Sequence, residues 1–169
     1  MQSLRQSVVL VCALTIAGYH SEAHADSAGT IGAACVPADV DVAANNYETA
    51  GFGVRFKGSA TGNIRLVCNL HWVEGKWRSL RMTYIDPDGM STAYRVRVRL
   101  METGGGNNVS TVIHTCDSNT SNTTTPTHMW CDFADFSPND YRHYWLDVLL
   151  ERTSTAASPE FLAANLRGD

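Results

Sequence analysis

Two histidines and two cysteines lie close together in the second half of the chain, as HTC at residues 114–116 and HMWC at residues 128–131. His114, Cys116, His128 and Cys131 could bind zinc in a tetrahedral site, because imidazole nitrogen and thiolate sulfur are usual ligands of this metal. The same two cysteines could instead form a disulfide, whose sulfur atoms do not bind zinc. The sequence favours the disulfide, because the amino terminus and the cysteine count both indicate an exported chain.

The amino terminus has the three parts of a secretory signal peptide. Arg5 supplies a positive charge, residues 8–17 form an unbroken apolar run, and Ala23 and Ala25 provide the small residues that a signal peptidase reads. The apolar run is too short for a membrane helix, which needs about 20 residues. We therefore predict that residues 1–25 are removed, and that the mature chain is exported to the periplasm or the cell exterior without a membrane span.

Removal of the signal peptide takes away Cys12 and leaves an even number of cysteines. An even count in an oxidising compartment predicts two disulfides. Three pairings are possible. We favour Cys35–Cys68 and Cys116–Cys131, because the members of each pair are adjacent in order.

The composition and the missing motifs narrow the function classes. The 169-residue chain has a formal net charge of −4, which disfavours general nucleic-acid binding because such proteins carry a basic footprint. The sequence contains no HExxH, GxSxG, SxxK, P-loop or dinucleotide-binding motif. We therefore expect no cofactor and, in the first instance, no enzyme. A hydrolase that uses His143 or His114 with a nearby aspartate remains an alternative, because catalytic triads are defined by geometry rather than by order.

The elements that must position these residues are strands. Apolar residues alternate with polar ones in residues 64–72, 80–85, 94–100 and 143–151, which is the pattern of a strand with one buried and one wet face. Turn-forming residues separate these segments. An example is Asp-Pro-Asp-Gly at residues 86–89, which is typical of a turn and lacks the later acidic ligands of a calcium loop.

About seven or eight such strands without a long helix predict an antiparallel β-sandwich, with a β-barrel as the alternative. We expect one domain over residues 35–169. The small residues at 26–34 indicate a flexible mature amino terminus.

The row opposite the predicted core holds the candidate binding residues. They are aromatic or basic and lie at alternating positions of the predicted strands or beside a turn: Arg95, Arg97, Arg99, Tyr141, His143, Trp145 and Trp77. In one interpretation this is a solvated face, on which arginines pair across strands with Asp147 and Glu151. In the other it is a shallow binding face, whose aromatic rings contact sugars and whose arginines donate hydrogen bonds to hydroxyls or carboxylates.

Several segments resemble a loose group of small exported bacterial β-rich proteins of unknown function. They are residues 54–62 (VRFKGSATG), 83–89 (TYIDPDG) and 94–100 (YRVRVRL), together with Cys68, Cys116 and the chain from Tyr144 onward. The resemblance covers most of the mature chain and implies an exported β-rich domain. No activity is assigned to the group, so it implies no site residue.

Three functions follow as hypotheses. The first is a non-catalytic exported binding or surface-interaction domain, whose ligand is a carbohydrate of the envelope or the surroundings. The second is a structural subunit of an envelope or surface assembly, because an edge strand can accept a strand from a partner. The third is the hydrolase named above.

Overall fold

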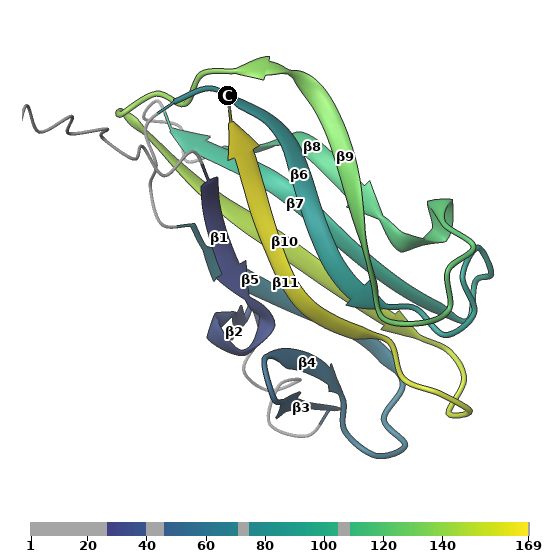
Figure 1. Ribbon diagram of the computed structural model, residues 1–169. Coiled ribbons are helices and arrows are strands. Elements are labelled where there is room, and N and C mark those ends of the chain that lie inside the picture. Colours follow the sequence, from purple (N-terminus) through teal and green to yellow (C-terminus); the bar gives the residue numbers. More distant parts are fainter. Residues whose placement is uncertain (1–26, 40–45, 71–74, 105–108, 169) are drawn as a thin grey trace, which may run out of the picture.

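The computed structural model describes residues 27–39, 46–70, 75–104 and 109–168, which form two antiparallel sheets packed face to face (Figure 1). The predicted β-sandwich is confirmed, and the sheets do not close into a barrel. The signal peptide predicted for residues 1–25 lies outside the described residues, as do residues 71–74 and 105–108 of the predicted strands and turns.

The first sheet, sheet A, has the strand order β3-β4-β11-β6-β9, and β1 also pairs with β11. Its strands are β1 (Ser27–Ile31), β3 (Tyr47–Ala50), β4 (Gly53–Phe56), β6 (Trp77–Ile85), β9 (Thr127–Phe136) and β11 (Glu160–Gly168). The outer surface of sheet A faces the viewer in Figure 1.

The second sheet, sheet B, lies behind sheet A in this view and has the order β2-β5-β10-β7-β8. Its strands are β2 (Val36–Pro37), β5 (Gly62–Asn69), β7 (Tyr94–Gly104), β8 (Ser110–Asp117) and β10 (Arg142–Arg152). Two short 3₁₀ helices, η1 (Gly32–Ala34) and η2 (Ser118–Thr120), follow β1 and β8.

The core lies between the sheets and consists of the apolar rows that the alternation predicted. Leu80 and Met82 of β6 and Leu146, Val148 and Leu150 of β10 are fully buried in one cluster. Burial of such a side chain stabilises the fold by about 1.5–3 kcal/mol. Both sheets are therefore rigid platforms, and the side chains of their outer rows are held at fixed positions.

The prediction that Trp77 points outward is wrong. The pairing of β6 with β9 is irregular between Trp77 and Ser79, and this bulge reverses the alternation at the start of the strand. The Trp77 side chain is consequently buried, and its ring packs 5.4 Å from the ring of Tyr144 and 6.0 Å from that of Phe136.

The start of the described chain also differs from the expected flexible segment. Ser27–Ile31 pairs with β11 over five residues, and Ala28 is buried. The small residues serve close packing here, because a Cβ added at Gly32 would lie 2.4 Å from the carbonyl oxygen of Phe161. A segment whose composition indicates flexibility is thus an ordered edge of sheet A.

Both predicted disulfides are confirmed. Cys116–Cys131 joins β8 of sheet B to β9 of sheet A, with Cα atoms 5.6 Å apart. Cys35–Cys68 joins the residue before β2 to β5, with Cα atoms 4.3 Å apart. One bridge therefore fastens the two sheets together at an edge, and the other fastens the short β2 to its own sheet.

The disulfide removes the zinc alternative, because the sulfur atoms of Cys116 and Cys131 are bonded to each other. The two histidines of that hypothesis have separate environments. His114 packs against Phe133, with ring centroids 4.9 Å apart, and burial lowers the pKa of its imidazole. His128 is exposed on sheet A, opposite Thr83.

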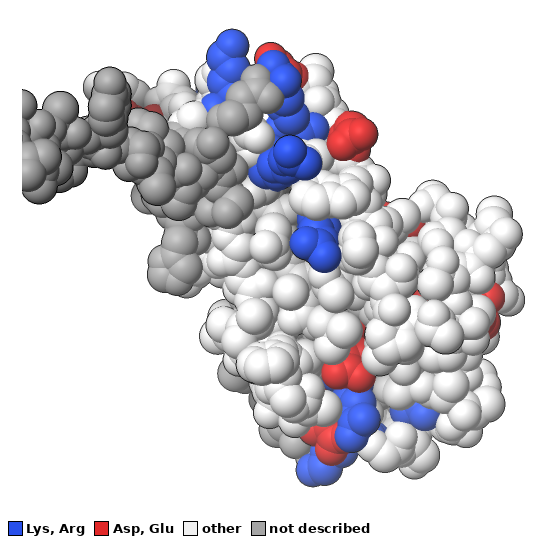
Figure 2. Space-filling view, in the orientation of Figure 1, with Lys and Arg blue, Asp and Glu red and all other residues white. Residues whose placement is uncertain are grey.

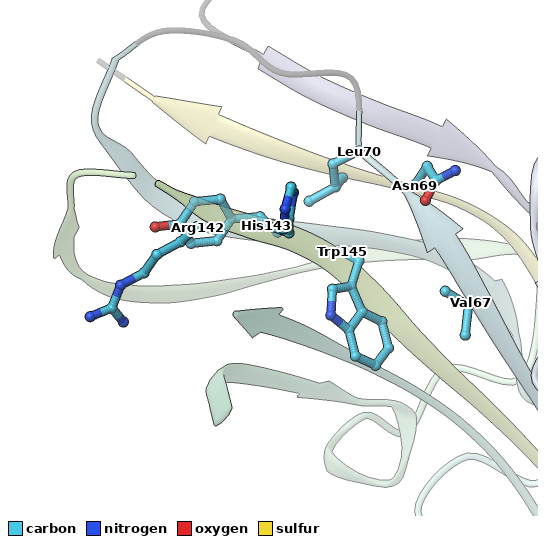
Figure 3. Close-up of a pocket in the computed structure, with 7 residues that line it drawn as sticks. Val67, Asn69, Leu70, Arg142, His143 and Trp145 are labelled. Atoms are coloured by element: carbon cyan, nitrogen blue, oxygen red, sulfur yellow. The ribbon is translucent and has the colours of Figure 1, made fainter. Parts of the chain in front are cut away.

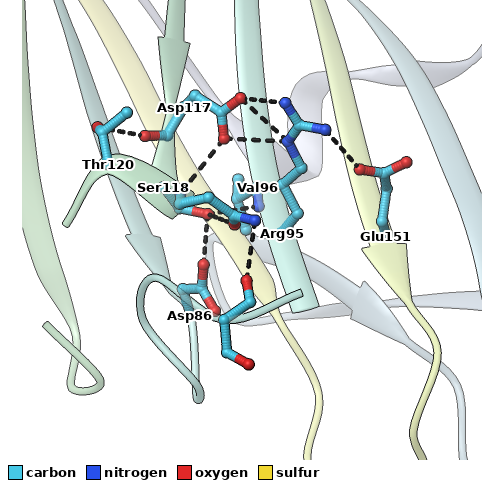
Figure 4. Close-up of polar contacts among 9 residues, drawn as sticks. Asp86, Arg95, Val96, Asp117, Ser118, Thr120 and Glu151 are labelled. Carbon is cyan, nitrogen blue, oxygen red and sulfur yellow. Dashed lines mark hydrogen bonds and ion pairs between the residues drawn. The ribbon is translucent and has the colours of Figure 1, made fainter. Parts of the chain in front are cut away.

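A buried carboxylate fixes the turn between β6 and β7. The Asp86 carboxylate accepts a hydrogen bond from the Ser118 hydroxyl, which in turn accepts one from the backbone N–H of Val96 at 2.8 Å (Figure 4). Burial, together with the neighbouring Asp88 carboxylate, raises the pKa of Asp86 to about 6.

This pKa predicts how stability depends on pH. The pKa in the folded state, about 6, exceeds the ordinary value of 3.8, so the folded state binds the proton more tightly. Asp86 therefore lowers the free energy of unfolding as pH rises from about 4 to about 6, by at most about 3 kcal/mol. We expect Asp86→Asn to gain stability relative to the wild type across this range, as measured by urea unfolding. Asp135→Asn, at an exposed position, is the control, and a constant difference between D86N and wild type would contradict the prediction.

The disulfide between the sheets predicts a second effect on stability. We expect the double variant Cys116→Ala, Cys131→Ala to lose about 3 kcal/mol in urea unfolding, because the bridge closes a loop with a sequence separation of 15. The same measurement on reduced and oxidised wild type separates the bridge from packing. Unchanged stability of the double variant would show that core packing alone holds the sheet edges together.

Candidate binding site on the second sheet

The outer face of sheet B carries most of the residues that the alternation selected. The pairing places Trp145 of β10 between Asn69 of β5 and Met101 of β7. Further along β10, Asp147 lies opposite Arg99, and Glu151 lies opposite Arg95. The face therefore has a charged part near the end of β10 and a less charged part near its beginning.

A fully buried carboxylate organises the charged part. Asp147 accepts hydrogen bonds from Arg65 through Oδ1 and from Arg99 through Oδ2, the latter with an Nε–Oδ2 distance of 2.8 Å. A buried carboxylate is strongly destabilising unless it is paired. The two guanidinium groups offset this cost by donating hydrogen bonds to Asp147 from the strands on either side of β10. Both arginines are therefore ion-paired, although the Arg65 side chain remains half exposed.

Arg95 is neutralised in the same way. Its Nε donates to both carboxylate oxygens of Asp117 at 3.0 Å, and its Nη1 donates to Glu151 at 3.1 Å (Figure 4). These hydrogen bonds, first that with Asp117, raise the pKa of Arg95. Arg97 differs, because its Nε is buried and has no hydrogen-bond partner among the described residues.

The less charged part contains a cavity of about 510 Å³, which we call the Trp145 pocket (Figure 3). The residues that line it come from the end of β5, the residue after it and the start of β10: Val67, Asn69, Leu70, Arg142, His143, Tyr144 and Trp145. The indole Nε1 of Trp145 donates to the Thr103 hydroxyl at 3.3 Å, which fixes the ring on the sheet. In Figure 3 the Trp145 and Val67 side chains extend to the same side of sheet B.

The turn before β10 borders this pocket and is held by hydrogen bonds. The backbone N–H of Asn139 donates to the Tyr144 hydroxyl at 2.9 Å, and this hydroxyl donates to Glu102 at 3.0 Å. Burial raises the pKa of Tyr144, so the hydroxyl keeps its proton for this bond. Tyr141 follows in the same turn and is 90% exposed.

The structure thus divides the predicted set. His143 and Trp145 line the pocket and Tyr141 lies in the turn that borders it, whereas Arg95 and Arg99 belong to ion pairs and Trp77 belongs to the core. Sequence reasoning placed Val67 and Asn69 on the outer row, but it did not select them as site residues. Only the register of β5 against β10 shows that they lie beside Trp145.

The lining of the pocket is suited to binding. It offers the rings of Trp145 and Tyr144, an amide, an imidazole and a guanidinium, and the residues that line it include no carboxylate to pair with His143. Within the described ranges, no group of three or more His, Cys, Asp or Glu residues could hold a metal ion. No described helix is long and apolar enough to cross a membrane.

No protein-family model and no curated protein matches the chain. Several solved structures are similar in fold, including the following three. The xylan-binding module CBM15 is 8% identical over 84% of this chain and 90% of that one, with a TM-score of 0.40. A low-affinity xylan-binding module from Roseburia intestinalis is 9% identical over 83% of this chain and 94% of that one, with a TM-score of 0.39.

The third is a family two carbohydrate esterase from Cellvibrio japonicus, which is 8% identical over 85% of this chain with a TM-score of 0.39. The match covers 34% of the esterase, so this chain spans about a third of its length. These similarities concern the sandwich fold and transfer no site residue.

The buried carboxylate predicts a measurable effect on stability. We expect Asp147→Asn to lower the free energy of unfolding by about 2 kcal/mol, because Arg65 and Arg99 lose a charged acceptor while both remain partly hydrated. The matched control is Asp135→Asn, which breaks an exposed ion pair with Arg78 and is expected to change stability by less than about 1 kcal/mol. Equal effects of the two variants in urea unfolding would contradict the role given to Asp147.

Proposed function

We propose that this protein is an exported, non-catalytic module that binds carbohydrate in the Trp145 pocket. The observation that carries the proposal is a cavity of about 510 Å³ beside an indole ring that a hydrogen bond fixes to a rigid sheet. Small-molecule sites have about 300–1,000 Å³, so the pocket is large enough for part of an oligosaccharide.

The lining supports a sugar ligand in particular. The face of an indole ring offers a flat apolar surface for the C–H groups of a sugar ring. Asn69, His143 and Arg142 carry amide, imidazole and guanidinium groups that can form hydrogen bonds with hydroxyls. Tyr141 is highly exposed and precedes Arg142 of the lining in the chain, which makes its ring a candidate contact for a longer ligand.

The electrostatics of this face favour an uncharged sugar. Arg65, Arg95 and Arg99 are held by carboxylates, and Arg142 in the pocket is paired with Glu102. Arg97 has no ion pair among the described residues, but the charges of the other arginines are balanced, so little net positive charge remains to attract an anion. Recognition then depends on hydroxyl hydrogen bonds and ring contact, which salt screens weakly.

Export is consistent with the two disulfides, because such bridges persist in oxidising compartments. A location outside the cytoplasm gives the protein access to envelope or extracellular polysaccharides.

The proposal is tested by a glycan array followed by calorimetric titration of the best neutral oligosaccharide. We expect Trp145→Ala to abolish measurable binding, since removing an aromatic contact of this kind costs several kcal/mol at a binding hot spot. We expect Asn69→Ala to weaken binding about tenfold through the loss of one hydrogen bond, and added NaCl to have little effect.

The control is Phe52→Ala, which removes a ring that is 74% exposed beside β4 of sheet A. Its affinity should equal that of the wild type. Unchanged binding in W145A, or an equal loss in F52A, would remove the pocket from consideration.

A further inference from the structure

The outer face of sheet A contains a second cluster, which the pocket does not involve. Trp130 of β9 is 43% exposed, and two arginines lie over its ring. The Cζ atom of Arg81 is 5.4 Å and that of Arg167 5.9 Å from the ring centroid. We call these three residues the Arg–Trp–Arg cluster; they come from β6, β9 and β11.

The two arginines have no carboxylate partner among the described residues. This distinguishes them from Arg55, Arg95 and Arg99, which are all ion-paired. The Nε of Arg81 is also buried without a hydrogen-bond partner in the described part of the chain. The cations are held by the indole ring rather than by an anion of the protein.

A cation–π contact attracts a guanidinium group to a ring without requiring a carboxylate partner, so N–H donors of the group stay available to a ligand. The donors remain in the plane of the group, where they can form two parallel hydrogen bonds with a carboxylate. Two guanidinium groups within about 6 Å of one ring centroid give a local concentration of positive charge.

A row of paired residues continues from the cluster along the same face. Gly29, Asn165, Arg81 and Trp130 are successive partners across β1, β11, β6 and β9. This row spans about 14 Å, since neighbouring strands lie about 4.8 Å apart. At its β1 end there is a cavity of about 510 Å³, lined by small or uncharged residues: Gly29, Thr30, Ile31, Ala34, Ala163 and Asn165.

Figure 2 views this face of the molecule. Positively charged side chains lie towards the end of the face at which β11 ends and again at the opposite end, in both places with acidic side chains near them, and the middle of the face is largely uncharged. At its β1 end the row therefore has an uncharged cavity that is large enough for a sugar ring. At its other end it has Arg81 and Arg167, which form no ion pair among the described residues.

We propose that this row binds an acidic polysaccharide, with a uronate carboxylate on the Arg–Trp–Arg cluster and another sugar ring of the same ligand in the cavity beside Asn165. A nucleic acid is disfavoured, because the chain has a net charge of −4 and such a ligand needs an extended basic surface. Asp132 lies on the same face, opposite Ser79, and its negative charge opposes the anion from one side.

The site is independent of the proposed function. It lies on the opposite side of the sandwich from the Trp145 pocket, and it uses charge where the pocket uses neutral donors. Each can therefore fail without the other.

The experiment titrates the full exported protein with trigalacturonic acid and, separately, with its methyl ester. We expect the acid to bind and the ester to bind at least about tenfold more weakly, since a charge-assisted hydrogen bond is lost. Arg81→Gln and Arg167→Gln should each weaken binding of the acid by a similar factor, and binding should fall as NaCl is added.

Two further variants control for net charge and for misfolding. Arg55→Gln changes the net charge by the same amount on the same sheet, but it removes a guanidinium group that Glu48 already holds, so affinity should be unchanged. Asp132→Asn should tighten binding several-fold, and a gain of affinity cannot come from misfolding. Thermal melts of all variants confirm that each is folded.

Four outcomes would overturn the inference: no binding of the acid at millimolar concentrations, equal binding of the ester, an equal loss in R55Q, or a weaker complex in D132N. Tighter binding of a short oligonucleotide than of the acid, with the same dependence on Arg81, would assign the cluster to phosphate polymers and overturn the polysaccharide.

Discussion

The ion pairs of the Asp147 carboxylate determine both the register of sheet B and the distribution of charge on its outer face. This carboxylate lies on the outer row of β10 yet has no exposed side-chain surface, so it must find charged donors on both neighbouring strands. Arg65 of β5 and Arg99 of β7 supply them, and a one-residue slip of either strand would turn its arginine to the core side. The pairing thus fixes the register of three strands. It also pairs two cations of the face with one carboxylate, away from the Trp145 end of the strand.

The fold followed from the sequence wherever a local rule decided the structure. Alternation is a property of neighbours along the chain, so the inward row of β7 and its outward arginines were predicted correctly. The rule failed at Trp77, where a bulge in the pairing of β6 with β9 shifts the alternation by one residue. A different rule, based on composition, failed for the residues before Cys35, since small side chains are common both in flexible segments and where two backbones approach closely, as at Gly32.

The site was less predictable, because it depends on which strands become neighbours. In the sequence Arg81 and Arg95 look alike, since each lies at a polar position of an alternating strand. Their environments differ because β7 pairs with β8 and β10, which carry Asp117 and Glu151, whereas β6 pairs with β9, which presents Trp130 opposite Arg81. No local pattern contains that information. Likewise Asn69 joins Trp145 only through a pairing between residues far apart in the chain.

The net charge of −4 does not conflict with a local anion site. Charges more than about 8–10 Å apart are largely screened at physiological ionic strength. The two sheets of a sandwich are about 10 Å apart, and the outer side chains add to this separation. Asp117, Asp147 and Glu151 are moreover already neutralised by arginines on sheet B. An anion near Trp130 is therefore influenced mainly by Arg81, Arg167 and Asp132, and the balance of these three groups decides its affinity.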